Sequence, residues 1–341
     1  MSEGKKRIMS GMRPTGKLHI GHYLGVLRNW LSFQDDYDCY FAIADWHALT
    51  TKYDQTSDIK QNIVDVAIDW ISSGIDPEKS TIYLQSLVPE IAELHIYFSM
   101  ITPQNWVERD PTLKDMVKIL RKEGDESQDI SGIISYGLLG YPVLQSADIL
   151  GFNASLVPVG MDQLAHLEFS RDVARRFNYI YKNDYFNEPQ PKLTETPLIK
   201  GIDGQKMGKS FNNDIKISDS DEDTAKKIMR AVTDKTRIKR SDPGHPDLCE
   251  VVCPYYKIFA DEETIKKQRS NCELALWGCT DCKKELAEII NAYFRQIRTK
   301  RAELASNPDY VDSIIRQGSS RAREVAQKVL ADTKKIMQLY M

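Results

Sequence analysis

The sequence has little that would suit a membrane protein, a secreted protein or a protein that coats DNA. It contains no run of about eighteen apolar residues, so we expect no segment that spans a membrane. The first residues lack the apolar core of a signal peptide, so we expect a cytoplasmic protein. Lysine plus arginine number 46 and aspartate plus glutamate 49, for a net charge of −3. This balance argues against general polyanion binding, so neither DNA nor a membrane is an expected partner, while a local basic face for RNA stays compatible with it.

Cysteine is scarce as well, with six residues in 341, and its distribution is uneven. Cys39 stands alone in an apolar stretch, where a buried core position is the simplest interpretation. The other five crowd into about a tenth of the chain, and in a cytosolic enzyme such clustering favours a metal site over disulfides. These five are Cys249, Cys253, Cys272, Cys279 and Cys282.

The chain does contain a regular alternation of short apolar runs and helical patterns. Its length leaves room for two domains, or for one large domain with a smaller appendage. Strand-like stretches at 7–10, 39–44 and 80–85 alternate with helical patterns at 21–32, 59–73 and 161–178. This alternation predicts an α/β fold with a parallel sheet covered by helices on both faces. Further on, Ser220-Asp221-Glu222-Asp223 predicts a helix cap that opens a mainly helical remainder.

A glycine-containing loop and two histidines near the N-terminus suit a phosphate-binding corner. The loop at 11–16 follows the first strand, and His19-Ile20-Gly21-His22 opens a helix. Helix N-terminal amides point at anions, and glycine lets a ligand approach the backbone. We expect His19 and His22 to place imidazole donors against phosphate oxygens, and Gly21 to leave flat space for an adenine ring. Two surface histidines at a helix start are the alternative.

A second motif, Lys206-Met207-Gly208-Lys209-Ser210, follows a turn signal much later in the chain. Two lysines three residues apart in a glycine-containing loop can close over a leaving pyrophosphate. Their charge matters most as negative charge moves off the α-phosphorus. The alternative is a solvated basic loop with no role in chemistry.

In this order and at this separation, the two motifs resemble the HIGH and KMSKS motifs of class I aminoacyl-tRNA synthetases, with Gly208 where many relatives have serine. The resemblance implies ATP with Mg²⁺, and in-line attack of an amino acid carboxylate on the α-phosphorus without a covalent enzyme intermediate. The catalytic residues that it implies are His19, His22, Lys206 and Lys209. The ATP-binding residues that it implies are Arg13, Thr15, Gly21, His22, Gly160, Asp162, Lys206, Met207, Lys209 and Ser210.

Three further segments, 84–90, 141–150 and 157–178, together with Trp106-Val107-Glu108-Arg109, are similar to bacterial tryptophanyl-tRNA synthetase. The similarity extends over nearly the whole chain. The tryptophan-binding residues that it implies are Met9, Tyr141, Gln145, Asp148 and Gln163.

The roles implied for these residues follow the chemistry of the substrate. Asp148 would accept the single N–H of the indole, which suits a buried carboxylate, and Met9 would pack against the ring. Tyr141, Gln145 and Gln163 would hold the ammonium group, while Asp162 and Gly160 would face the ribose. Tyrosyl-tRNA synthetase shares the pattern of Tyr141, Gln145 and Asp148. A tyrosine expected on its first strand is Met9 here, which favours tryptophan.

Four of the clustered cysteines have a spacing that suits a metal group. Cys249, Cys272, Cys279 and Cys282 are separated by 22, six and two residues, and four such thiolates can supply tetrahedral ligands. Zinc sites more often show two close pairs, and here only the last two cysteines form one. The spacing resembles that of a subset of bacterial tryptophanyl-tRNA synthetases with a 4Fe–4S cluster. It therefore favours iron–sulfur over zinc and over free buried thiols, and Cys253 could replace Cys249.

The resemblance also implies a domain organisation. Residues 1–188 would form a nucleotide-binding catalytic domain with a doubly wound, Rossmann-like parallel sheet, and 189–215 a linker with the KMGKS loop. Residues 216–305 would form an all-helical anticodon-binding domain with the cysteines, and 306–341 a C-terminal helical segment.

The implied partners are tryptophan, ATP, tRNA(Trp) and a second copy of the chain in a homodimer. Basic residues of the helical region would meet tRNA phosphates, unless they lie on solvated helix faces. They are Lys235, Arg237, Lys239, Arg240, Arg295, Arg298, Lys300 and Arg301. The alternative function is a non-catalytic tryptophan-sensing or RNA-binding paralogue, but such a binder has no need of the two motif lysines.

Overall fold

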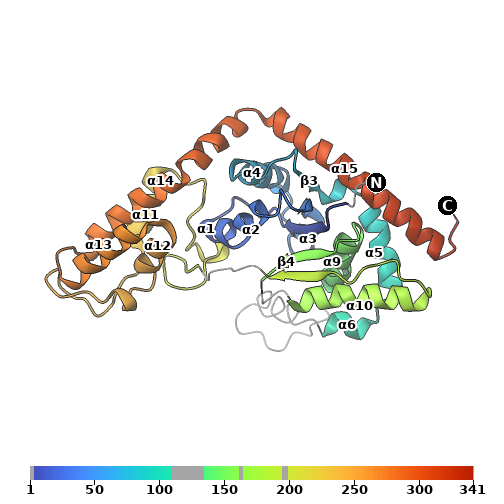
Figure 1. The fold of residues 1–341 in the computed structure, drawn as a ribbon, viewed down its shortest axis with the longest axis horizontal. Helices are drawn as coiled ribbons and strands as arrows, with labels where there is room; N and C mark the ends of the chain where they lie inside the picture. Colours follow the sequence, from blue (N-terminus) through green and yellow to red (C-terminus); the bar gives the residue numbers. More distant parts are fainter. Residues whose placement is uncertain (1–3, 110–133, 161–163, 194–198, 341) are drawn as a thin grey trace.

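The centre of the molecule is a five-stranded parallel sheet with the strand order β3-β2-β1-β4-β5 (Figure 1). The computed structural model describes residues 4–109, 134–160, 164–193 and 199–340. The strands are β1 (Arg7–Met12), β2 (Asp38–Ile43), β3 (Ser80–Leu84), β4 (Leu156–Val159) and β5 (Gln190–Leu193). The predicted α/β fold with a doubly wound parallel sheet is confirmed, and the three predicted strands are β1, β2 and β3.

The strand order reverses between β1 and β4, and this reversal opens a crevice. β1 pairs with β2 along its whole length, but with β4 only at Ile8 and Leu156. The two strands therefore separate toward their carboxyl ends. In open parallel sheets, the crevice beyond such a reversal is where ligands bind.

Alternate residues of the strands point to opposite faces and build two separate cores. Ile8, Phe41 and Ile82 belong to one buried cluster, while Met9 and Tyr40 belong to the other. Helices cover both faces, as predicted. Those between the strands are α1 (Ile20–His22), η1 (Tyr23–Leu27), α2 (Arg28–Leu31), α3 (Asp45–Lys52), α4 (Ile59–Ser72), η2 (Gln85–Leu87), α5 (Glu90–Ile101), α6 (Gln104–Glu108), α8 (Tyr136–Leu139), α9 (Tyr141–Leu150) and α10 (Leu164–Ile180).

The predicted helix at 21–32 is formed by α1, η1 and α2, which run on continuously from Ile20 to Leu31. Its middle turn, η1, is a π-helix, a widened turn that is often found at functional sites. The predicted helix at 59–73 is α4. The helix predicted at 161–178 corresponds to α10, although residues 161–163 lie outside the described part of the chain.

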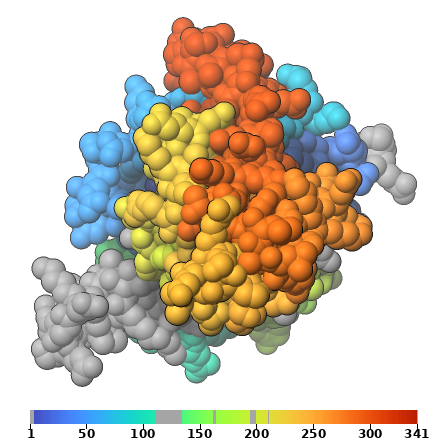
Figure 2. Space-filling view, turned by 90° about the vertical axis from the view of Figure 1, so that its left-hand side faces the viewer, coloured from blue at the N-terminus to red at the C-terminus, as the bar shows by residue number. Residues whose placement is uncertain are grey.

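A helical region stands beside the sheet and includes most of the residues after 208. Its elements are η5 (Lys209–Phe211), α11 (Asp221–Arg230), η6 (Pro246–Leu248), α12 (Val252–Phe259), α13 (Glu262–Glu273) and α14 (Cys279–Ala305). The Ser220 hydroxyl caps α11 by accepting the Asp223 N–H at 3.0 Å, so the predicted helix cap is confirmed. Figure 2 looks at the molecule from this end and shows the helical region (gold to orange) in front. Tyr256 and Phe294 of this region are buried in the same cluster as Ile8 of the sheet.

The last helix, α15 (Pro308–Ile336), covers the edge strand of the sheet. α14 and α15 meet at an apex above α4 (Figure 1). The Leu84 N–H donates to the Ser319 hydroxyl at 3.0 Å, and a Cβ on Gly318 would lie only 1.9 Å from the Ile82 carbonyl oxygen. Glycine alone permits this approach, which shields the exposed edge of β3. Within the described ranges, no helix is long and apolar enough to cross a membrane.

Candidate functional site

A cavity of about 600 Å³, called the main cavity here, lies at the carboxyl ends of β1, β2 and β4. Eight of the predicted site residues line it. They are Met9, Arg13, His22, Tyr141, Gln145, Asp148, Gly160 and Lys206. A second hollow of about 560 Å³ lies at the amino ends of the strands, away from both motifs. The main cavity is thus the place where the crevice of the sheet and the two motifs meet.

The histidines of the first motif form a closed hydrogen-bonded pair. His19 is the N-cap of α1, and its Nδ1 accepts the His22 N–H at 3.3 Å. In return, the His22 Nδ1 accepts the His19 N–H at 3.3 Å, and the two rings stack with centroids 3.7 Å apart. Because both Nδ1 atoms are acceptors, each neutral ring carries its proton on Nε2.

Burial keeps both rings neutral. It lowers the pKa of His19 to about 4, with nearby Asp214 acting against this and Lys209 adding to it. Burial, His19 and Lys209 also hold the pKa of His22 well below its usual value. At neutral pH the pair therefore offers two uncharged Nε2–H donors. His22 lines the main cavity, and His19 is buried beside it.

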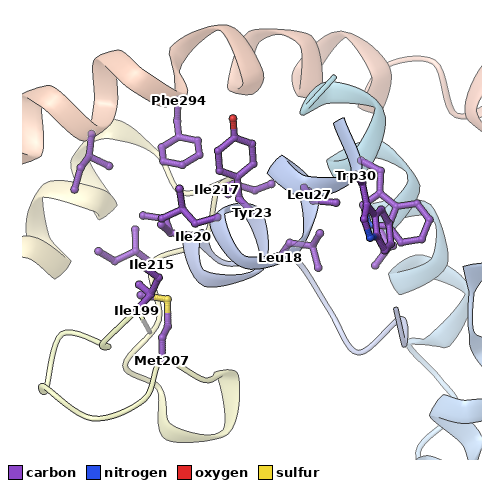
Figure 3. Close-up of a cluster of buried hydrophobic side chains, with 14 of the residues drawn as sticks. Leu18, Ile20, Tyr23, Leu27, Trp30, Ile199, Met207, Ile215, Ile217 and Phe294 are labelled. Carbon is purple, nitrogen blue, oxygen red and sulfur yellow. The ribbon is translucent and has the colours of Figure 1, made fainter. Parts of the chain in front are cut away.

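Gly21 lies against the ring of His19, with Met207 of the second motif in van der Waals contact beyond it. A Cβ at this position would lie 3.0 Å from the His19 ring and 3.7 Å from the Met207 sulfur. The space beside Gly21 is thus filled by the protein itself, a reason for glycine that the sequence did not reveal. Leu18, Ile20 and Met207 are buried in one hydrophobic cluster, which Figure 3 shows between the first motif, the KMGKS loop and α14.

The KMGKS loop lies against the loop that precedes the first motif. Lys206 lines the main cavity, and the Lys209 ammonium donates to the Gly16 carbonyl at 2.6 Å. Burial lowers the pKa of Lys209 to about 8, against the influence of Asp69 and Asp214. Thr15 is exposed and does not line the cavity. Asp162, Gln163 and the side chain of Ser210 lie outside what the structure describes.

Asn213 organises the KMGKS loop, a role that the sequence prediction missed. Its buried amide accepts the Gly208 N–H at 2.9 Å, and donates to the Lys206 carbonyl at 3.1 Å and to the Asp203 carboxylate at 2.8 Å. Gly201 packs against it so closely that a Cβ there would lie 2.3 Å from the Asn213 Cγ. The available signal was a pair of asparagines shortly after the motif, because asparagine often forms turns.

Asp148 stands at the base of the main cavity with two partners that the sequence prediction missed. Gln85 Nε2 donates to its two oxygens at 2.8 and 3.0 Å, and His47 Nε2 lies 2.8 Å from Oδ2. Gln85 directly follows β3, and His47 lies in the first turn of α3, shortly after β2. Because parallel strands end at one edge of the sheet, polar residues at strand ends were the available signal. A carboxylate has about four acceptor positions, so Asp148 can still accept another donor.

The remaining predicted residues of the pocket surround this carboxylate. Met9 is buried on β1, and Gln145 faces the cavity from α9. The Tyr141 hydroxyl shares a hydrogen bond of 3.0 Å with His166 Nε2, which positions the ring from α10. The main cavity therefore combines an apolar wall, a buried carboxylate and a hydroxyl.

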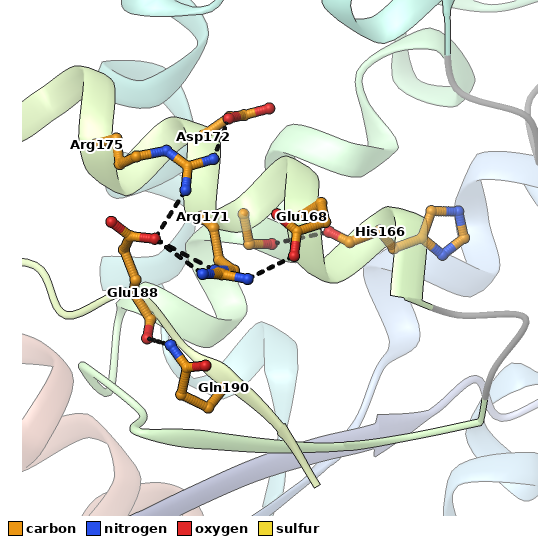
Figure 4. Close-up of polar contacts among 8 residues, drawn as sticks. His166, Glu168, Arg171, Asp172, Arg175, Glu188 and Gln190 are labelled. Atoms are coloured by element: carbon orange, nitrogen blue, oxygen red, sulfur yellow. Dashed lines mark hydrogen bonds and ion pairs between the residues drawn. The ribbon is translucent and has the colours of Figure 1, made fainter. Parts of the chain in front are cut away.

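The charged residues of α10 have a structural role. Figure 4 shows Arg171 and Arg175 reaching Glu188, which precedes β5, while His166 points away from this group. The ion pairs measure 3.2 and 2.8 Å. They tie α10 to β5, so this part of the family-like segment is explained by packing rather than by substrate contact.

All five clustered cysteines line a small cavity of about 20 Å³ in the helical region, called the cysteine cavity here. Cys249, Cys253, Cys272 and Cys282 are buried, and Cys279 is half-buried. Cys253 donates to Cys249 and lowers its pKa, whereas burial raises the pKa of Cys282 to about 11. Cys39 is buried in β2, as predicted.

The donor set of the cysteine cavity suits a thiolate-bound metal group. Gln268 Nε2 lies 3.4 Å from the Cys253 sulfur and 3.8 Å from the Cys282 sulfur, and Arg237 lies 3.9 Å from that of Cys272. Such N–H donors stabilise charged sulfur. In the part of the chain that the structure describes, no three His, Cys, Asp or Glu side chains are grouped closely enough to hold one metal ion. The cavity has room for about one water molecule, so the thiols would have to move apart to hold a larger metal group.

Two of the arginines for which the sequence left tRNA contact or a solvated helix face open are internal. The side chains of Arg298 and Arg301 are only 13% and 12% exposed and form ion pairs with Asp221 and with Asp65 and Asp69. Their charge is used within the protein, so they do not offer a free basic surface. Lys235 and Arg240 are mostly exposed.

Comparison with known proteins places this geometry among the tRNA synthetases. Residues 1–295 match the family model described as tRNA synthetases class I (W and Y). The chain is 44% identical to a tryptophan–tRNA ligase of Thermotoga maritima, with 98% of this chain and 99% of the relative covered. It is 40% identical to a tryptophan–tRNA ligase of Aquifex aeolicus, with 98% and 100% covered. The solved tryptophanyl-tRNA synthetase of Campylobacter jejuni, complexed with ADP and tryptophan, superposes with a TM-score of 0.88 at 34% identity, covering 98% and 100%.

Proposed function

The chain belongs to the class I tRNA synthetases for tryptophan and tyrosine, and within them to the tryptophan–tRNA ligases, and we propose that its main cavity is where tryptophan and ATP react. It is an ATP-dependent ligase that joins tryptophan to tRNA(Trp) for protein synthesis, and we assign this activity to the cytoplasm. The observation that carries the proposal is the convergence of both phosphate motifs and a buried carboxylate on one cavity. The Campylobacter jejuni relative holds ADP and tryptophan in the same complex, which supports neighbouring positions for both substrates.

The proposed reaction has two steps. A carboxylate oxygen of tryptophan attacks the α-phosphorus in line, and the bond to the β-phosphate oxygen breaks, so pyrophosphate leaves and tryptophanyl-adenylate forms. The 2′-hydroxyl of the terminal tRNA ribose then attacks the tryptophanyl carbonyl carbon, and AMP leaves. Positioning and charge stabilisation supply most of the rate, because no enzyme nucleophile is needed.

The chain's own residues would act at the phosphates in two ways. The neutral His19 and His22 would donate Nε2–H to phosphate oxygens, and Lys206 and Lys209 would take up the charge that develops on pyrophosphate. Arg13, Thr15, Gly160, Asp162, Met207 and Ser210 complete the proposed ATP site. Bound Mg²⁺ would add neutralisation of the phosphate charge.

Tryptophan recognition would rest on Asp148 accepting the indole N–H. His47 and Gln85 fix the orientation of this carboxylate, and a site with a fixed buried acceptor rejects a substrate that leaves it unpaired. Met9 would contact the ring, while Tyr141, Gln145 and Gln163 would hold the ammonium group. Met9 in place of a tyrosine argues against tyrosine as the substrate.

Amino-acid-dependent ATP–pyrophosphate exchange tests the proposal, run in parallel with tryptophan, tyrosine and no amino acid. We expect exchange with tryptophan alone. Exchange with tyrosine would keep the two phosphate motifs and overturn the assigned pocket. No exchange with either, in protein that still binds tryptophan, would identify a non-catalytic paralogue.

For the cysteine cavity we propose a 4Fe–4S cluster held by Cys249, Cys272, Cys279 and Cys282, with zinc as the alternative. The convergence of the thiols and the N–H donors beside them support the proposal. Because the cysteines of a cluster bind different irons, the lack of a close three-ligand group weighs more against zinc. When bound, such a group would brace the helical region. Iron and sulfide analysis after anaerobic purification tests this, and colourless protein with stoichiometric zinc would contradict it.

We further propose that the ligase is a homodimer. Ile96 and Met100 are one turn apart on α5, so they share one face of the helix, and they are 49% and 73% exposed, which suits a surface covered by a second copy. Light scattering should give twice the chain mass of 39.0 kDa. Ile96→Asp with Met100→Asp should give monomers, while Ile238→Asp, at an exposed position of the helical region, should not.

We also propose that Lys235, Lys239 and Arg240 contact tRNA phosphates. Lys239→Glu should lower the rate of tRNA charging. It should leave the rate of tryptophan-dependent exchange unchanged, because that reaction needs no tRNA. Equal loss in both reactions would contradict a tRNA role.

A further inference from the structure

Asp69 of α4 is a fully buried carboxylate that contacts two other segments of the chain. Its Oδ2 accepts the Leu18 N–H at 2.9 Å, and its Oδ1 accepts from Arg301 Nε of α14 at 2.6 Å. Arg301 also donates to Asp65, one turn earlier on α4, at 2.8 Å. Burial raises the pKa of Asp69, while Arg301 and the Leu18 amide act against this rise. Removing a carboxylate from water is unfavourable, and here the Arg301 guanidinium and the Leu18 N–H offset that cost.

Leu18 is the residue directly before His19, and both of its backbone groups are held from α14. On one side, Arg301 reaches the Leu18 N–H through Asp69. On the other, the Leu18 carbonyl accepts the Ile217 N–H at 3.1 Å, and the Ile217 carbonyl accepts from Arg298 Nε at 3.2 Å. Arg298 and Arg301 are three residues apart and so lie on one face of α14. Two hydrogen-bonded chains thus run from one helix face to the two backbone polar groups of a single residue, Leu18.

α14 connects Leu18 with the cysteine cavity. The helix begins at Cys279 and runs through Arg301 to Ala305, a length of about 40 Å at 1.5 Å per residue. Phe294 of the same helix packs on Tyr23 with ring centroids 5.3 Å apart, and Figure 3 shows this contact directly above the first motif. The position of α14 is therefore transmitted to the start of α1 by both packing and hydrogen bonds.

We propose that Asp69 is a positioning residue, which ties Leu18 to Arg301 and thereby sets His19 and His22 in place relative to α14. The proposal rests on the proposed function, because these are the histidines assigned to ATP. Asp69 touches no substrate. It acts by fixing Leu18, the residue directly before the first motif. The position of the two histidines is thereby set relative to α14 of the helical region.

Asp65 supplies a matched control. Asp65→Asn removes a carboxylate from the same arginine, but it is Asp69, and not Asp65, that accepts from Leu18 and raises the pKa of Lys209. Asp69→Asn keeps the size of the side chain, but Leu18 and Arg301 donate to different oxygens of Asp69, and in the amide one of these acceptors becomes an NH₂ donor. It also removes the main charge that opposes the lowering of the Lys209 pKa, where Asp214 and Lys216 are the other charged neighbours.

The experiment measures tryptophan-dependent exchange of the full chain as a function of ATP concentration and pH, with tryptophan binding and thermal unfolding alongside. For Asp69→Asn we expect kcat/KM for ATP to fall about 30-fold, since small misplacements of catalytic groups are costly. We expect tryptophan binding to change less than about twofold, and the alkaline limb of the pH profile to move to lower pH. Asp65→Asn should lose less than about threefold and keep the wild-type limb.

Equal losses in the two variants, with the alkaline limb unmoved, would overturn the proposal and leave Asp69 a merely structural residue. If Asp69→Asn does not fold, Arg301→Lys provides the test, because it keeps the carboxylate charged and shortens the reach to it. Arg301→Lys should then lower kcat/KM for ATP at an unchanged alkaline limb, and wild-type kinetics would overturn the proposal. Wild-type protein without exchange in the same assay would instead contradict the proposed function.

Discussion

The main cavity and the cysteine cavity differ in how far their polar groups are already satisfied. In the main cavity, Asp148 and the paired His19 and His22 have protein partners within 2.8 to 3.3 Å, around about 600 Å³ of open space. In the cysteine cavity, five thiols surround only about 20 Å³, and the N–H···S contacts from Gln268 and Arg237 are 3.4 to 3.9 Å long. The first site is built before its ligand arrives, whereas the second would be completed by the proposed metal group.

This difference follows from what each site must do. A catalytic site gains rate when its donors are fixed before the charge develops, so the protein supplies their partners. A structural metal site gains stability because binding itself orders the ligands. Variants should therefore change rate at the main cavity and stability at the cysteine cavity.

The largest expected effect is at the KMGKS loop. Lys206→Ala with Lys209→Ala should lower tryptophan-dependent exchange at least about a thousandfold, because two charges that stabilise leaving pyrophosphate are lost. Tryptophan binding, measured by calorimetry, should survive. Lys79→Ala, which removes an exposed lysine paired with Asp35 at the far end of the strands, serves as the control. Unchanged exchange in the double variant would remove the loop from the mechanism.

A smaller loss is expected from Asp148→Asn. The amide keeps the shape but leaves His47 or Gln85 facing an N–H donor, so kcat/KM for tryptophan should fall about a hundredfold. The KM for ATP should stay within about twofold of wild type. Equal loss for both substrates would show that Asp148 supports the whole cavity rather than the indole.

The pH dependence of the exchange reaction tests the role of Lys209 in the main site. Lys209 has a pKa of about 8, so kcat/KM for ATP should fall as the pH rises through 8, by up to about tenfold per unit. In the unfolded chain Lys209 has its usual pKa of 10.5, so between pH 8 and 10.5 the unfolded state binds the proton and the folded state does not. The free energy of unfolding therefore rises with pH in this range. Activity should therefore decline without unfolding. In Lys209→Arg the alkaline decline should disappear, and a decline that persists would assign it to another group.

The smallest effect on rate is expected at the cysteine cavity. Cys282→Ser should abolish iron or zinc binding and lower the unfolding temperature by several degrees, while tryptophan-dependent exchange at low temperature changes less than about threefold. Cys39→Ser, at a buried position in β2, should leave the metal content unchanged. Full metal content in Cys282→Ser would contradict the proposal that the cysteine cavity binds a metal group through Cys282.

Much of the main cavity could be predicted because local sequence dictates local geometry. His19-Ile20-Gly21-His22 starts a helix as expected, and alternation of strands and helices was enough to predict a parallel sheet. His47, Gln85 and Asn213 were missed because each gains its role from a partner distant in sequence. For Arg298 and Arg301 the sequence offered tRNA contact or a solvated helix face, and neither holds, because a helical charge pattern does not reveal the carboxylates opposite.

The sequence by itself determined the chemistry of this protein, because the residue types and spacing of two motifs and of the cysteines do not depend on how the chain packs. Tertiary structure alone decided which groups meet. It placed Asp148 between His47 and Gln85, brought five cysteines around one small space, and set Asp69 between Leu18 and Arg301. Such contacts join positions far apart in the chain, and their energy comes from burial and charge at the meeting point, which no local pattern encodes.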